Sequence, residues 1–135
     1  MTPRRRKRPD MDVTPLVKEG AQIIQSYRGG AFRVSGQVYD GAVIVSPQET
    51  IVWDVRGTVD ALQQGDFDVL TDKADGIDVV LLGSGAALQF IDPALKAGLK
   101  AKGLSVDVMD TGAASRTYNV LMAEGRRVVA ALLPV

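Results

Sequence analysis

The pattern of hydrophobic and polar positions changes about halfway along the chain. The first half carries short apolar or alternating runs, with turn residues every several positions. Such spacing is typical of an antiparallel meander. Tight turns are expected at Gly29-Gly30 and Asp40-Gly41, because these dipeptides favour reversal of the chain. The strands are expected at 21–27, 31–34, 37–39, 42–45 and 50–55.

The second half alternates apolar runs with helical patterns. Three runs predict strands, at 77–82, 105–109 and 128–133. The first is largely apolar, as expected of a central strand covered on both faces. The order β-α-β-α-β with short connections implies right-handed crossovers and parallel strands. Residues 60–76 are less regular, and they predict a loop with one short helix.

Capping residues mark both predicted helices of the second half. Asp92 is a good N-cap and Pro93 suits the first helical position, while Gly103 is expected to end that helix. Asp110 or Thr111 begins the next helix. We therefore predict an α/β fold: one domain with a mixed β-sheet, antiparallel in its N-terminal half and parallel in its C-terminal half, flanked by helices.

Charge is distributed unevenly although the formal net charge is zero. Arg4–Arg8 carry +5, so the rest of the chain carries −5. A block of like charges repels itself, and we expect residues 1–12 to be a disordered arm before a domain at 13–135. Such an arm is either a solvated terminus or a contact for nucleic acid, anionic lipid or an acidic partner. No aromatic residue interleaves the cations, which argues against nucleic acid.

The composition excludes several chemistries. The chain has no cysteine and no histidine, so disulfides, thiolate or imidazole catalysis and zinc–thiolate sites are absent. The acids of residues 60–78 lack the later glutamate of a calcium loop, and we interpret them as a solvated face without metal. No apolar segment resembles a secretory signal or a membrane span, so a cytoplasmic location is expected.

The most suggestive local motif is Gly83-Ser84-Gly85, directly after a predicted strand. Glycine-rich turns in this position let backbone N–H groups approach an anion. The full dinucleotide motif needs glycine where this chain has Leu88. The alternative is that the glycines permit tight packing where the chain leaves the sheet. No cofactor is predicted.

A second polar group follows the next strand. Asp110 and Thr111 should open on the same sheet edge as Ser84, where open α/β sheets bind ligands. Arg116 and Asn119 are three residues apart and share a helix face. The candidate ligand cleft comprises Gly83, Ser84, Gly85, Asp110, Thr111, Arg116 and Asn119. The alternative is plain helix capping, with Arg116 paired to an acid.

Enzymatic roles have little support in these residues. Ser84 as a nucleophile would lack a histidine base, and an acid-base role for Asp110 would need burial to tune its pKa. We predict no catalytic residues and no enzyme activity. Trp53 lies within a strand run and is expected in the core.

The stretch from Asp107 to Leu133 carries the most specific pattern, with Asp-Thr, Thr-Tyr-Asn and Glu-Gly-Arg in order. It resembles the small α/β family that includes the adipogenesis-associated Mth-domain protein and complex I assembly factor three. Gly83-Ser84-Gly85 resembles the Gly-Thr-Gly of that family, and the likeness spans residues 13–135. The resemblance implies a single domain with a mixed sheet. It assigns no catalytic residues to this chain.

The resemblance implies a non-catalytic interaction module that assists assembly of a membrane complex such as respiratory complex I. The expected partners are proteins, such as subunits of that complex, and the chain itself is expected to be a monomer or a weak homodimer. The location would then be cytoplasmic or peripheral to the inner membrane. The alternative is a protein that binds a small ligand or anion in the candidate cleft.

Overall fold

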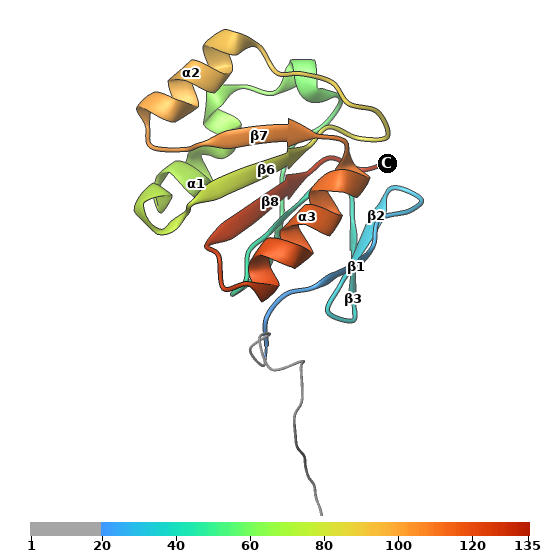
Figure 1. Cartoon of the computed structure of the whole chain (residues 1–135). Helices are drawn as coiled ribbons and strands as arrows, with labels where there is room; N and C mark the ends of the chain where they lie inside the picture. Colours follow the sequence, from blue (N-terminus) through green and yellow to red (C-terminus); the bar gives the residue numbers. More distant parts are fainter. Residues whose placement is uncertain (1–19) are drawn as a thin grey trace, which may run out of the picture.

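A five-stranded mixed sheet forms the centre of the fold (Figure 1). The structure is a computed structural model that describes residues 20–135. The strand order is β5-β4-β8-β6-β7, with β6 parallel to both β8 and β7, and β4 antiparallel to both β8 and β5. These strands are β4 (Val43–Val45), β5 (Thr50–Val52), β6 (Val79–Gly83), β7 (Val106–Met109) and β8 (Val128–Leu132).

A second, antiparallel sheet contains β1 (Ile24–Ser26), β2 (Ala31–Val34) and β3 (Gln37–Asp40). Its β2–β3 hairpin turns at Ser35 and Gly36, which both have positive φ (45° and 86°) as a two-residue hairpin turn requires. The tight turn predicted at Asp40-Gly41 does not join paired strands, although Gly41 has a positive φ of 79°. Asp40 pairs with Ala31 as the last residue of β3, and the chain then leaves for the central sheet.

Short helical turns and two longer helices connect the strands of the second half. The prediction of a loop with one short helix over 60–76 underestimates the helical content, because four short helical elements occur there: η2 (Val59–Ala61), η3 (Gln64–Phe67), α1 (Asp68–Thr71) and η4 (Ala74–Gly76). The longer helices are α2 (Pro93–Ala101) and α3 (Thr111–Ala123). Asp92 caps α2 as predicted, because its Oδ1 accepts a hydrogen bond from the Ala94 N–H at 2.8 Å.

The core has two parts, one on each face of the central sheet. Alternation along β6 sends Val80 and Leu82 to the face covered by α1 and α2, and Leu81 to the face covered by α3 and the three-stranded sheet. Trp53 lies in the first part, where its Nε1 donates to the Asp66 carbonyl at 2.8 Å. The prediction that Trp53 belongs to the core is confirmed.

The predicted fold class is confirmed: one mixed α/β domain with parallel strands in its second half. The strands of the first half divide between two sheets instead of forming one meander, because β4 pairs with β8 and not with β3. The predicted arm at 1–12 lies outside the described residues. Among the helices within residues 20–135, none is long and apolar enough to cross a bilayer.

Candidate functional site

The two βα corners predicted to face the same way lie side by side at the carboxyl edge of the sheet. Gly83 pairs with Met109 in the parallel ladder, and the Ser84 N–H donates to the Met109 carbonyl at 2.8 Å. Beyond the strands, the Thr111 N–H donates to the Gly85 carbonyl at 2.9 Å. The sequence-based placement of these two loops was therefore correct, and each loop supports the other.

Thr111 connects three segments at this edge. Its side chain is fully buried, accepting from the Gly85 N–H at 2.9 Å and donating to the Leu133 carbonyl at 2.7 Å. The hydroxyl thus satisfies two buried backbone groups that would otherwise lack partners. In this structure Thr111 joins the end of β6, the start of α3 and the segment after β8.

Gly83 allows the close approach of these segments. A Cβ atom at this position would lie 2.8 Å from Thr111 Oγ1 and 2.9 Å from Leu132 Cδ2, closer than real Cβ contacts. Gly85 has φ of +104°, a conformation that side chains other than glycine rarely adopt. The two glycines therefore meet different backbone requirements, one of space and one of conformation.

The Ser84 hydroxyl shapes the loop between β6 and α2. It is nearly buried, donates to the Ala87 carbonyl at 2.8 Å and accepts from the Gln89 N–H at 3.1 Å. The loop held in this way exposes two large apolar side chains, Leu88 (50%) and Phe90 (77%). Sequence reasoning missed both, although large apolar residues two apart in a segment without helical or strand period were a usable signal.

Asp110 is the N-cap of α3, as one reading of the sequence predicted. Its Oδ1 accepts a hydrogen bond from the Ala113 N–H at 2.9 Å, which satisfies one of the free donors of the first turn. The carboxylate also lies at the positive end of the helix dipole. This contact stabilises the corner in which Thr111 sits.

Arg116 and Asn119 contact the three-stranded sheet. The Arg116 guanidinium donates to the Tyr27 hydroxyl at 3.1 Å and is exposed. Asn119 accepts from the Ile24 N–H at 3.0 Å and donates to the Ile24 carbonyl at 2.8 Å, so it pairs with β1 as a neighbouring strand would. Asn119 is about 12 Å along the helix from Thr111, since each residue adds about 1.5 Å.

Tyr118 links α3 to the segment before β1 by a further hydrogen bond. Its ring is fully buried and its hydroxyl donates to the Gln22 carbonyl at 2.9 Å. Burial raises the pKa of this phenol well above its ordinary value, because the phenolate would lose its hydration. Tyr118 belongs to the Thr-Tyr-Asn pattern seen in the sequence, but its long-range hydrogen bond required the tertiary structure.

Acidic side chains do not converge on a metal position in the described part of the chain. No group of three potential metal ligands occurs within residues 20–135. The site residues are joined by backbone and side-chain hydrogen bonds, and Arg116 is the one exposed charge on the α3 side of the corner.

These features define a small mixed α/β protein whose two βα corners are tied by internal hydrogen bonds. The DUF498/DUF598 family, described as a protein of unknown function, matches residues 24–133. An uncharacterised protein of Rhodobacter capsulatus is 35% identical over 86% of this chain and 87% of its own length. The chain therefore belongs to the DUF498/DUF598 family.

The assembly factors expected from the resemblance are also among the relatives. The NADH dehydrogenase (ubiquinone) 1 alpha subcomplex assembly factor 3 of Bos taurus is 31% identical over 114 residues. These residues make up 84% of this chain but only 61% of the bovine protein. The chain thus spans less than two thirds of that relative.

Solved structures share the fold. A protein described as an outer membrane protein from Bartonella henselae superposes with a TM-score of 0.78 at 37% identity, over 86% of this chain and 97% of that one. A Mth938-like domain from Bordetella pertussis superposes with a TM-score of 0.67 at 28% identity, over 92% and 90%. The resemblance to the Mth-type family is confirmed.

Proposed function

We propose that this chain is a non-catalytic interaction module that assists assembly of a membrane complex, with respiratory complex I as the specific candidate. The family relationship to assembly factor 3 supports this role. The bovine protein is considerably longer than the matched region, so the proposal concerns only the part of the function that this domain carries.

One observation about the site carries the proposal. The polar groups at the corner are bonded to the chain itself: Thr111 to Gly85 and Leu133, and Ser84 to its own loop. The same loop exposes Phe90 and Leu88, which are costly to leave in water without a role. Hydrogen bonding at the corner thus serves to hold an apolar contact surface in a fixed shape.

The partner we propose is a protein with an apolar socket and an acidic rim. Helix α2 begins three residues after Phe90 and carries Lys96 and Lys100, with Lys102 at its C-cap, and all three lysines are exposed. Within residues 20–135, none of the three lysines forms an ion pair. In this proposal Phe90 is the central apolar contact and the lysines lie toward the edge of the interface, where charge complementarity would direct the partner.

Complex assembly in the native host provides the test. We expect deletion of the gene to lower the amount of assembled complex I on native gels, and the unmodified gene to restore it. Phe90→Asp should fail to restore assembly, because a carboxylate at the anchor opposes burial in an apolar socket. Val38→Asp, at another exposed apolar position on β3, should restore it. Unchanged complex I after deletion would reject the role.

The predicted ligand cleft is a second proposal, supported by Arg116. Its exposed guanidinium bonds a neutral phenol, Tyr27, so its charge is available to an anion near the paired corners. We expect an anionic metabolite to raise the melting temperature of the unmodified protein in a thermal-shift panel. The effect should disappear in Arg116→Ala and persist in Arg33→Ala, an exposed control on β2. A panel without any stabilising anion would count against this cleft.

A further inference from the structure

A groove lies at the end of β8 opposite the paired corners. It has a volume of about 880 Å³ and lies between the β4–β5 turn, the α1–η4 segment and the turn after α3. Its apolar lining includes Ile44, Ile51, Val69, Ile77, Val128 and Val129. A smaller hollow of about 280 Å³ shares three of these residues and continues to Trp53. The smaller hollow is also lined by the acids Asp54 and Asp66, whereas the larger groove alone has the volume that small ligands occupy.

Charged groups line this groove only at its rim. Three are cations, Lys73, Arg126 and Arg127, and one is an acid, Glu49. This excess of cations is local, since residues 20–135 contain ten Lys and Arg against thirteen Asp and Glu. The lining therefore combines an apolar floor with a positively charged end.

The two arginines at the rim differ in how far they are already engaged. Arg127 donates to the Asp78 carboxylate at 2.7 Å, and its guanidinium lowers the pKa of that carboxyl. Among residues 20–135, the acid that pairs with Arg126 is Glu124, at 4.0 Å, the outer limit of an ion pair. Arg126 thus retains donors for an incoming anion, while Arg127 is held in place beside it.

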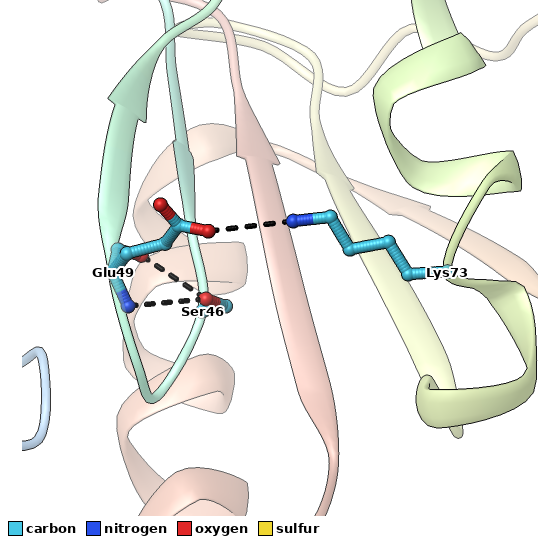
Figure 2. A network of polar contacts seen from close by, with 3 residues as sticks. All are labelled: Ser46, Glu49 and Lys73. Carbon is cyan, nitrogen blue, oxygen red and sulfur yellow. Dashed lines mark hydrogen bonds and ion pairs between the residues drawn. The ribbon is translucent and has the colours of Figure 1, made fainter.

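An ion pair crosses the groove (Figure 2). The Glu49 carboxylate on the β4–β5 turn lies 3.3 Å from the ammonium group of Lys73, which follows α1. Both side chains are 56% exposed. The Ser46 hydroxyl donates to the Glu49 carbonyl and accepts from the Glu49 N–H, which holds the turn. Exposed ion pairs contribute little to stability, so an anion entering the groove is able to replace Glu49 as the partner of Lys73.

We propose that this groove binds a single acyl chain that ends in a carboxylate, in other words a fatty-acid-like ligand. The hydrocarbon chain lies along Ile44, Ile51 and Val129, and the carboxylate binds Arg126 together with Lys73. An extended peptide suits the groove less well, because its backbone would lose hydrogen bonds to water against an apolar floor. This site is separate from the corner used in the proposed function.

Binding of laurate to the full chain, below its micelle-forming concentration, tests the site by titration calorimetry. We expect saturable binding of one laurate and at least tenfold weaker binding of dodecylammonium, which has the same chain length and the opposite charge. Equal binding of both probes, or no saturable binding of laurate, would overturn the proposal. This comparison uses the unmodified protein, so it does not depend on any variant folding.

Three variants locate the binding. Arg126→Glu should weaken laurate binding about tenfold or more, whereas Arg33→Glu on β2 makes the same charge change away from the groove and should alter it less than about twofold. Glu49→Gln should strengthen binding, because it frees Lys73 and removes a repelling charge. Equal losses in Arg126→Glu and Arg33→Glu, or weaker binding in Glu49→Gln, would show that laurate binds elsewhere.

Discussion

Replacing Thr111 by valine is expected to lower the free energy of unfolding by about 2–5 kcal/mol. Valine keeps the shape of the side chain but removes the hydroxyl that serves Gly85 and Leu133. Both backbone groups lie in buried surroundings, so each would lose its partner without gaining water. Urea unfolding, followed by circular dichroism, measures the loss directly.

Thr117→Val is the matched control for this prediction. Thr117 lies on the same helix and is half-buried, and valine there makes the same chemical change away from the corner. We expect it to change the unfolding free energy by less than about 1 kcal/mol. A Thr111→Val protein no less stable than Thr117→Val would show that the corner does not depend on the threonine hydroxyl.

Tyr118 is expected to make the protein lose stability at alkaline pH. In the unfolded chain its phenol ionises at about pH 10, whereas burial keeps it protonated in the folded protein to a higher pH. Unfolding above about pH 10 therefore releases a proton. The contribution of Tyr118 is fully present below that pH and declines above it by up to about 1.4 kcal/mol per pH unit.

Tyr118→Phe separates this effect from other alkaline transitions. At about pH 8 the variant should be less stable by about 1 kcal/mol, because the bond to the Gln22 carbonyl is lost. The difference should shrink and then reverse between about pH 10 and about pH 11, since phenylalanine does not titrate. Ser115→Ala removes a buried hydroxyl that does not ionise in this range, so its difference should stay constant. A constant difference for Tyr118→Phe would contradict the prediction.

These two residues suggest how the fold serves the proposed function. Thr111 and Tyr118, both buried on α3, tie this helix to the strand ends and to the segment before β1. The loop that exposes Phe90 follows directly from the corner that Thr111 supports. Loss of the threonine hydroxyl should therefore weaken partner binding through the shape of this loop, without any contact to the partner.

Local signals were sufficient for much of the fold. Asp92 was predicted as one helix cap and Asp110 or Thr111 as the other, and Asp92 and Asp110 act as the caps, because an N-cap depends on residues within one helical turn. The parallel strands of the second half were also predicted correctly. Their short helical connections leave only one hand of crossover, which places Ser84 and Thr111 at the same edge.

Pairing between strands was not decided by local pattern. The wholly apolar β4 differs in polarity from β3, which marks it as a buried strand, but nothing in its sequence predicts that it pairs with β8 and not with β3. A tight turn was predicted at Asp40-Gly41 because that dipeptide is a strong local signal. In the structure Asp40 pairs with Ala31 and the chain then leaves for the central sheet, so no hairpin joins β3 to β4.

The features of the candidate site fall into the same two groups: those predicted from the local sequence and those decided by tertiary contacts. The amino-acid sequence alone identified the glycine-rich corner, its threonine neighbour and the absence of histidine and cysteine, since these are properties of single residues and adjacent elements. Only the tertiary structure decided that Thr111 bonds Leu133, that Asn119 pairs with Ile24, and that a groove opens beside Arg126. Each of these features joins segments far apart in the chain, and their meeting depends on how the whole core packs.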